Sequence, residues 1–165
     1  MISRRRLLIR CAAGAVTMSL AWPGRRSGAA ENFAVVHTDA EWRKLLTSAQ
    51  YDVLRKDGTE QPFSSALLQE HRQGRFCCAG CDLTLFSSET KFESGTGWPS
   101  FWAPLDNAVG VRRDTSWGMV RDAVYCLQCG GHLGHVFDDG PKPTGLRYCM
   151  NGVALLFKPA RAAAG

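Results

Sequence analysis

Apolar residues after position 30 follow helical spacing first and strand spacing later. A helix is expected near residue 40, where Thr38 and Glu41 form the capping-box pattern. Its apolar positions recur at the spacing of one helical face: Trp42, Leu45 and Leu46. Residues 51–63 mix polar and aromatic side chains, which favours an irregular surface connection. A short helix is expected around residues 66–71.

From residue 75 onward, short β-type runs alternate with the turn residues Gly, Pro, Asp and Asn. The pattern predicts strands at residues 75–78, 83–86, 108–112, 119–126, 135–137, 146–149 and 153–157. No helical stretch long enough for a parallel crossover lies between them, so we expect antiparallel sheets. With the short helices before it, this pattern predicts a mainly β domain of the α+β class in residues 31–165.

Four of the seven cysteines form two Cys-x-x-Cys pairs. The pairs are Cys78 with Cys81 and Cys126 with Cys129. Two such turns present four thiolates to one tetrahedral zinc ion. Two local disulfides or a redox-active pair are the alternatives that the spacing leaves open. Because four cysteine ligands close the coordination sphere, a zinc ion here would be structural, and a zinc hydrolase is excluded.

Three cysteines lie outside these pairs, and one of them has neighbours suited to chemistry. Cys11 belongs to the N-terminal segment, and Cys77 is expected to be a buried, inert packing residue. In an extended strand, Arg147 and Asn151 share a face with Cys149. A nearby cation lowers the pKa of a thiol, and an amide can donate a hydrogen bond beside it. Cys149 is therefore the candidate reactive thiol.

Two histidines, His132 and His135, follow the second cysteine pair. A zinc ion held by that pair would help to position them. A nucleophilic thiol at Cys149, a histidine acid and an arginine form a combination used in nucleophilic catalysis. On spacing alone, two core histidines and a buried cysteine remain the alternative.

Residues 1–30 have the three parts of an export signal. Arg4, Arg5 and Arg6 stand just before two leucines, which resembles a twin-arginine signal, and small residues up to Ala30 offer a cleavage region. The apolar stretch between them is interrupted by Arg10 and is too short for a comfortable membrane span. We therefore expect export to the periplasm or otherwise out of the cytoplasm. A disordered basic tail or a membrane anchor is the alternative.

The net charge of +5 comes from this N-terminal segment. Six of the 20 basic residues lie in residues 1–30, whereas all 15 acidic residues lie later, so residues 31–165 carry 14 basic and 15 acidic side chains. A nearly neutral domain lacks the basic surface that binds phosphate backbones. We therefore expect no nucleic-acid partner.

Three ordered motifs resemble the type B methionine sulfoxide reductases. The motifs are residues 91–101 (KFESGTGWPSF), 132–141 (HLGHVFDDGP) and 146–151 (LRYCMN). Both cysteine pairs also fall where that family has them, and the similarity extends from about Glu41 to Phe157. The resemblance implies two antiparallel β-sheets in a tent-like, zinc-stabilised domain. It also implies thiol-dependent reduction of methionine-R-sulfoxide to methionine.

The resemblance implies a role for each matching residue. Cys149 matches the nucleophile, which becomes a sulfenic acid, and His135, with His132 nearby, matches the proton donor. Trp98 and Phe137 match residues that contact the substrate. The remaining matches are the pocket residues Arg147 and Asn151 and the zinc ligands Cys78, Cys81, Cys126 and Cys129. The implied partners are oxidised proteins or peptides and a thioredoxin-like or other thiol reductant, and we expect a monomer.

The sequence departs from the family at two positions. Many members have a recycling cysteine where this sequence has Thr96, so another thiol must reduce the sulfenic acid. Cys77 would be an unusual recycling group, and a direct reaction with an external thiol is favoured. Gly152 replaces the usual serine after Asn151, which is a milder change.

Two other functions compete with the reductase. A zinc-ribbon-like binding module explains the cysteine pairs but gives no reason for Cys149, His135 and Trp98 in their motifs. A thiol–disulfide oxidoreductase would use one Cys-x-x-Cys pair for its chemistry. Stoichiometric zinc on both pairs would exclude that second alternative.

Overall fold

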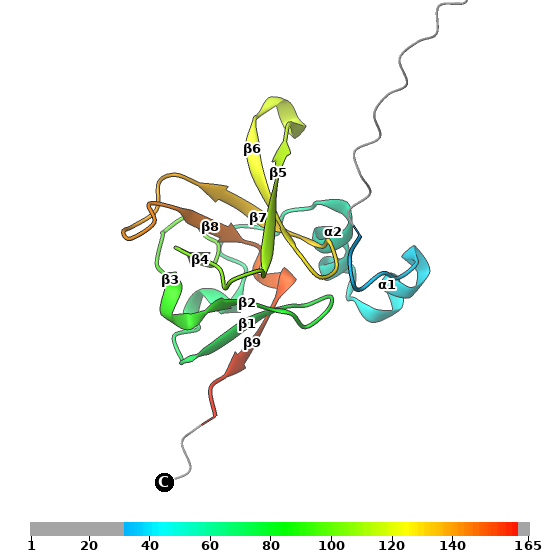
Figure 1. Cartoon of the computed structure of the whole chain (residues 1–165), viewed down its shortest axis with the longest axis horizontal. Helices are drawn as coiled ribbons and strands as arrows, with labels where there is room; N and C mark the ends of the chain where they lie inside the picture. The colour runs from blue at the N-terminus through cyan, green and yellow to red at the C-terminus, as the bar shows by residue number, and fades with distance from the viewer. Residues whose placement is uncertain (1–31, 162–165) are drawn as a thin grey trace, which may run out of the picture. The chain divides into compact units, whose positions relative to one another are not determined.

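The computed structural model describes residues 32–161. The export signal expected in residues 1–30 lies outside the described residues. Within residues 32–161, no helix is both long and apolar enough to cross a membrane. This part of the chain contains two short α-helices followed by nine short strands (Figure 1).

The first helix, α1 (Asp39–Leu45), begins where the capping box predicts. The Glu41 N–H donates to the Thr38 hydroxyl at 3.3 Å, and the Thr38 N–H donates to the Glu41 carboxylate at 2.8 Å. Trp42 is buried, but Leu45 is 60% exposed, so the expected apolar stripe is wrong at that position. The helix ends at Leu45. The backbone of Leu46 is extended, and the Leu46 side chain is buried in place of Leu45.

A second helix, α2 (Ser48–Lys56), overlaps the segment that the sequence pattern marks as irregular. The prediction overlooked a second capping box, in which Thr47 and Gln50 exchange hydrogen bonds of 3.2 and 3.0 Å. One face of the helix is buried in the core: Tyr51, Val53 and Leu54. Asp57 ends the helix in the left-handed conformation, and the irregular connection starts only there.

The smaller sheet has three antiparallel strands in the order β2-β1-β9. Its strands are β1 (Gly74–Cys78), β2 (Thr84–Ser87) and β9 (Leu155–Pro159). A 3-10 helix, η1 (Ala66–Gln69), precedes it where a short helix is expected. Since Cys78 ends β1, the first cysteine pair forms the turn between β1 and β2.

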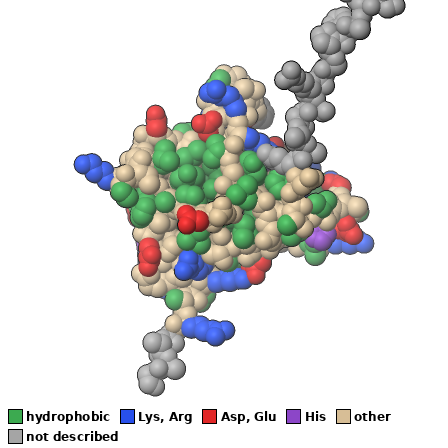
Figure 2. All heavy atoms as spheres, viewed as in Figure 1, with side chains coloured by type: hydrophobic (Ala, Val, Ile, Leu, Met, Phe, Trp, Pro, Cys, Tyr) green, Lys and Arg blue, Asp and Glu red, His purple; other side chains and the backbone are tan. Residues whose placement is uncertain are grey.

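The larger sheet has six antiparallel strands in the order β3-β4-β8-β7-β6-β5. Its strands are β3 (Lys91–Phe92), β4 (Ser100–Phe101), β5 (Val109–Asp114), β6 (Arg121–Cys126), β7 (His132–Phe137) and β8 (Arg147–Met150). The predicted mainly β fold with two antiparallel sheets is confirmed. The sequence pattern missed β3 and β4 because two-residue strands show no periodicity. On the face in Figure 2, hydrophobic side chains gather over this sheet and charged ones surround them.

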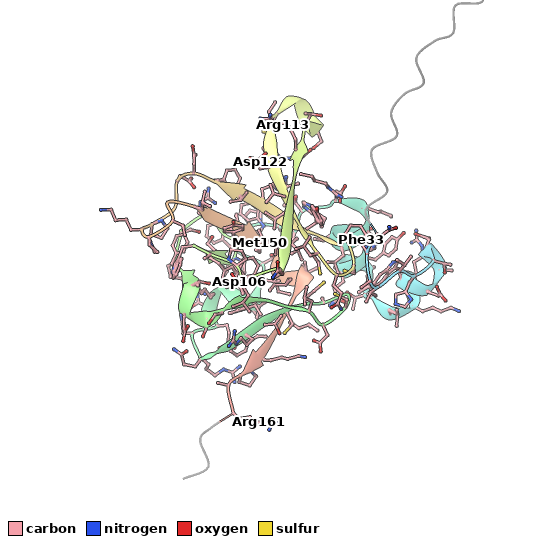
Figure 3. The ribbon with its side chains drawn as sticks, viewed as in Figure 1. Phe33, Asp106, Arg113, Asp122, Met150 and Arg161 are labelled. Carbon is pink, nitrogen blue, oxygen red and sulfur yellow. The ribbon has the colours of Figure 1, made fainter. Side chains whose placement is uncertain are left out.

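Aromatic side chains from both sheets meet in the core. The ring centroids of Phe76 on β1 and Phe86 on β2 lie 4.9 and 4.4 Å from that of Phe101 on β4. Each such buried ring contributes about 3–5 kcal/mol relative to alanine. Met150, at the end of β8, is also buried in this core (Figure 3). Because side chains alternate along a strand, this position of Met150 directs Cys149 to the opposite face of the sheet.

Candidate active site

The candidate nucleophile and the candidate acid lie on neighbouring strands. The register of β7 with β8 places His135 directly opposite Cys149. Gly134, one position earlier, allows the strands to approach closely, since a Cβ there would lie 2.1 Å from the Cys149 carbonyl oxygen. The backbone therefore brings the imidazole and the thiol together, as the catalytic hypothesis requires.

Five of the predicted site residues line one small pocket. The pocket has a volume of about 110 Å³, well below the roughly 300–1,000 Å³ of sites for larger ligands, so it fits a single side chain. The predicted residues in its wall are Trp98, His135, Phe137, Cys149 and Asn151. Thr59, Arg121 and Gly134 complete the wall, and none of these three was predicted as a site residue.

The Cys149 thiol is only partly exposed, and its surroundings act on its pKa in both directions. Burial raises the pKa of Cys149, and the Thr96 hydroxyl and the Arg147 charge lower it by less. The effect of Arg147 has the predicted sign, but burial outweighs it. The resting thiol therefore keeps its proton at neutral pH and must release it when the sulfur reacts.

Arg147 acts from behind the pocket and not in its wall. Its guanidinium donates two hydrogen bonds of 2.8 Å to Asp139, in the two-pronged geometry that suits a carboxylate. The guanidinium carbon also lies 4.4 Å from the ring centroid of Phe137, a cation–π contact. Arg147 therefore holds Phe137 in the pocket wall and places a positive charge near Cys149.

A row of hydroxyl groups leads to the thiol. The Ser94 hydroxyl lies 2.7 Å from that of Ser100 and 2.9 Å from that of Thr96. The Thr96 hydroxyl in turn lies 3.8 Å from the Cys149 sulfur. Thr96 can therefore hydrogen-bond to the sulfur, but it cannot form a disulfide with it.

Cys77 takes no part in this pocket. It lies on β1, in the other sheet, is 1% exposed, and its sulfur is 3.7 Å from the Thr84 hydroxyl. Its burial agrees with the packing role predicted from the sequence.

His132, which was predicted among the catalytic groups, lies beside the pocket and not in its wall. Its ring is 2% exposed, and its centroid is 5.3 Å from that of His135 in a T-shaped contact. Burial lowers the pKa of His132 to about 4, so the ring is neutral at physiological pH. Neither ring nitrogen has a hydrogen-bond partner among the described residues. His132 therefore supports His135 by packing.

Glu60, on the connection after α2, ties together three parts of the site. Its N–H donates to the Asn151 side-chain oxygen at 2.9 Å, and its carbonyl accepts the Trp98 indole N–H at 3.2 Å. Its carboxylate accepts the N–H groups of Gly152 and Val153, the first two residues of the 3-10 helix η4 (Gly152–Ala154). Glu60 therefore fixes two pocket residues and the chain that follows Cys149.

The four paired cysteines form one cluster. Their sulfur atoms all lie within 4.8 Å of one another, with 3.7 Å between Cys78 and Cys129 and 3.5 Å between Cys81 and Cys126. A disulfide needs about 2.05 Å, whereas four sulfurs about 2.3 Å from a tetrahedral ion are about 3.8 Å apart. The cluster therefore has the geometry of a metal site joining the β1–β2 and β6–β7 turns.

Comparison with known proteins agrees with this site. The family model described as the SelR domain matches residues 46–159. The peptide methionine sulfoxide reductase MsrB of Leptospira interrogans is 52% identical over 128 residues, which is 77% of this chain and 98% of that protein. The MsrB of Pseudomonas putida is 58% identical over 120 residues, 72% of this chain and 90% of that protein. This chain belongs to the MsrB family.

A third MsrB relative matches this chain, and the family match covers the whole site. The MsrB of Methanosarcina barkeri is 55% identical over 126 residues, 76% of this chain and 89% of that protein. Every residue of the pocket wall and all four clustered cysteines lie within the matched residues 46–159. The family predicted from three motifs is therefore confirmed.

Sequence reasoning missed the MsrB site residues that act through contacts distant in the sequence. Glu60 was interpreted as part of a surface connection, although its contacts lie 38 to 93 positions away. Arg121 lies in the strand predicted at residues 119–126, and Asp114 lies just after the strand predicted at residues 108–112. Both lie outside the three motifs. Asp139 lies inside the second motif, and its acidic side chain is only eight positions from Arg147. That spacing was a usable signal for an ion pair between them.

We expect Glu60→Gln to weaken substrate binding and destabilise the domain. The neutral amide loses one acceptor oxygen and the charge-assisted hydrogen bonds to η4, worth about 1.5–3 kcal/mol. The backbone hydrogen bonds from residue 60 to Trp98 and Asn151 remain. The segment that makes them is less firmly anchored to η4, so KM is expected to rise a few-fold, with a smaller change in kcat. Steady-state kinetics and thermal unfolding would measure both effects. The matched control is Glu89→Gln, an exposed residue outside the pocket. Equal behaviour of the two variants would contradict the role of Glu60.

Proposed function

We propose that this chain reduces methionine-R-sulfoxide in oxidised proteins to methionine, using electrons from a thiol. The pocket carries this proposal: Cys149, His135 and Trp98 line one cavity of about 110 Å³ in a member of the MsrB family. Relatives named peptide methionine sulfoxide reductase support the substrate class. Free methionine sulfoxide carries the same reacting group and is a second substrate for the same pocket.

The reaction transfers one oxygen atom and two electrons. The Cys149 sulfur attacks the sulfoxide sulfur and forms a sulfur–sulfur bond, while the sulfur–oxygen bond of the substrate breaks and the protonated oxygen leaves as hydroxide. Hydroxide then attacks the Cys149 sulfur, which breaks the sulfur–sulfur bond, releases methionine and leaves Cys149 as a sulfenic acid. Methionine is the reduced product, and Cys149 is the group oxidised. The proton released by the thiol balances the proton taken up by the departing oxygen. A nearby group must therefore move that proton, and His135 is opposite the thiol.

The other wall residues recognise the substrate. A methyl sulfoxide presents an apolar methyl group on one side and a polar oxygen on another. The rings of Trp98 and Phe137 offer the apolar surface, while His135 offers a hydrogen bond to the oxygen. The methyl group, the oxygen and the sulfur of the sulfoxide thus each face a different fixed group, and Cys149 faces the sulfur. Three such contacts accept one epimer of the sulfoxide and reject the other.

An external thiol completes the cycle. One thiol attacks the Cys149 sulfenic acid to form a mixed disulfide and release water, and a second thiol then restores Cys149. Thr96 at 3.8 Å from the sulfur has no thiol to contribute, and Cys77 lies in the other sheet. A thioredoxin-like protein or another dithiol supplies both electrons in this proposal.

The metal that we propose for the four-cysteine cluster is zinc. The four sulfurs fit a tetrahedral ion, and zinc is the usual partner of four cysteines in paired turns. With its coordination closed by Cys78, Cys81, Cys126 and Cys129, zinc supplies structural support and no chemistry to the reaction. The sulfur distances also argue against a redox role for either pair, because they support one shared ion.

Export of this domain by a twin-arginine signal in residues 1–30 is part of the proposal. The arginines at positions 4–6 before two leucines, an apolar stretch and a region of small residues support it. The route also suits a domain that loads zinc on reduced thiols, because twin-arginine export carries folded proteins. The periplasm is the proposed compartment.

The experiment that tests the function follows the mature protein with dithiothreitol and a peptide that contains one methionine sulfoxide. The separated R and S epimers are supplied in parallel, and methionine formation is measured by chromatography. Consumption of the R epimer alone is expected. If the folded, zinc-loaded protein consumes neither epimer, the proposed function is wrong and a binding role becomes the better explanation.

A further inference from the structure

The hairpin of β5 and β6 carries an acidic side chain into contact with the candidate acid. Asp114 ends β5 directly opposite Arg121 at the start of β6. Its neighbours Arg113 and Asp122 are labelled on this hairpin in Figure 3. Arg121 lines the pocket, so the hairpin brings both an arginine and a carboxylate to the edge of the active site.

The Asp114 carboxylate accepts hydrogen bonds from three residues. The His135 Nε2 lies 2.9 Å from Oδ2, an Arg121 guanidinium nitrogen lies 2.8 Å from the same oxygen, and the Ser116 N–H donates to Oδ1 at 2.8 Å. The hydrogen bonds from Ser116, followed by that from His135, hold the pKa of Asp114 well below its usual value. Asp114 is therefore ionised at neutral pH, and its side chain is 19% exposed.

An ionised carboxylate can only accept hydrogen bonds, and this fixes the protonation of the facing nitrogen. The His135 Nε2 must carry a hydrogen in order to donate to Asp114. In the neutral ring Nδ1 is then the nitrogen without a proton, and it has no partner among the side chains that the structure describes. In the protonated ring, Nδ1 carries the proton that can be transferred.

We propose that Asp114 is a positioning residue that holds His135 through Nε2, so that Nδ1 is the nitrogen that exchanges a proton with the sulfoxide oxygen. This inference rests on the proposed reductase function and adds a residue to it. The protonated ring gives its Nδ1 proton to the departing oxygen and becomes neutral, while the Nε2 hydrogen stays on the bond to Asp114. The Asp114 carboxylate thereby fixes the orientation of the ring relative to the bound sulfoxide.

The neighbouring groups support a fixed ring. His132 packs against His135 in a T-shaped contact, with ring centroids 5.3 Å apart, and limits its rotation. Arg121 shares the Asp114 oxygen and offsets part of its charge, so the carboxylate stays paired even when the His135 ring is neutral. Arg121 also places a buried Nε without a partner among the described residues at the pocket edge. The carboxylate thus orders two side chains of the pocket.

Kinetics of Asp114→Asn test the inference directly. We expect kcat to fall about 10- to 100-fold while KM stays within about twofold, because a supporting contact to a catalytic group is lost but the substrate contacts remain. Asp122→Asn, the same change at an exposed position of the same hairpin, is the matched control and should keep wild-type kcat. Asp114→Glu retains the carboxylate and should recover at least tenfold of the lost kcat. It also guards against a general loss of folding.

A double-mutant cycle separates positioning from mere stability. If Asp114 acts through His135, adding Asp114→Asn to His135→Asn should slow turnover by less than about twofold further. Nitrogen-15 chemical shifts of the His135 ring should show hydrogen on Nε2 in the wild type and a changed tautomer in Asp114→Asn. Multiplied losses in the double variant, or an unchanged tautomer, would overturn the inference.

The failure of this inference is distinguishable from a failure of the proposed function. Wild-type protein that reduces the R epimer but loses nothing with Asp114→Asn overturns only the role of Asp114. Folded wild-type protein that reduces neither epimer overturns the function, and with it the inference.

Discussion

Replacement of Cys149 by serine is expected to lower the reduction of methionine-R-sulfoxide by roughly 10⁴-fold or more. A hydroxyl is not ionised at neutral pH and cannot become a sulfenic acid, so neither the attack nor the electron transfer can occur. The fold should persist, because the change removes little volume and a serine hydroxyl can keep the polar contacts that the thiol makes with Thr96 and Arg147. Methionine formation and thermal unfolding would be measured on the same sample.

The matched control for that variant is Cys77→Ser. Cys77 is buried in the other sheet beside Thr84, and it lies outside the pocket. The control should therefore keep dithiothreitol-driven turnover per folded molecule. Turnover that survives in Cys149→Ser, or disappears in a folded Cys77→Ser, would show that the reactive thiol has been misassigned.

Removal of the metal is expected to unfold the domain. Binding of zinc by four cysteines is worth about 10–16 kcal/mol in small zinc domains, which equals or exceeds the roughly 5–15 kcal/mol of net stability of a typical protein. The Cys126 sulfur is fully buried 3.5 Å from that of Cys81, so Cys126→Ser leaves a polar group and an incomplete ligand set in the core. Loss of the cooperative unfolding transition is expected, in parallel with loss of zinc measured by elemental analysis.

The metal prediction can be separated from the catalytic one. Cys149→Ser should retain about one zinc ion per chain, since its sulfur is not part of the cluster. A Cys126→Ser protein that is metal-free, folded and active would contradict the structural role of the cluster. Zinc loss from Cys149→Ser would contradict the separation of the two cysteine classes.

Seven of the nine strands and the metal cluster could be predicted from the sequence because their signals are local. Turn residues mark the strand ends, and the spacing within each cysteine pair is a property of one turn. The helix α2 was missed for a different reason. Its capping residues Thr47 and Gln50 are also local, but the polar and aromatic mixture after Tyr51 hid the apolar face.

The pocket could be predicted only in part. Some pocket residues belong to contiguous motifs that can be recognised in the sequence: Trp98, Phe137 and Cys149. Glu60 and Asp114 instead act through contacts with segments that are distant in the sequence. No sequence pattern states that the β5–β6 hairpin lies against β7. His132 shows the opposite case, because two histidines in one motif predicted two similar roles. The structure places one in the pocket wall and buries the other behind it.

The pairing of β7 with β8 holds the acid and the nucleophile in place before the substrate binds. His135 and Cys149 are opposite each other in a hydrogen-bonded ladder, and the close approach at Gly134 leaves little room for the strands to separate. The acid and the nucleophile are therefore already in place before the substrate binds. Most of the entropy lost on binding is then that of the substrate and not that of the protein. Changes in substrate preference should then arise in the loops that carry Trp98 and Thr59, while the two strands keep the same chemistry.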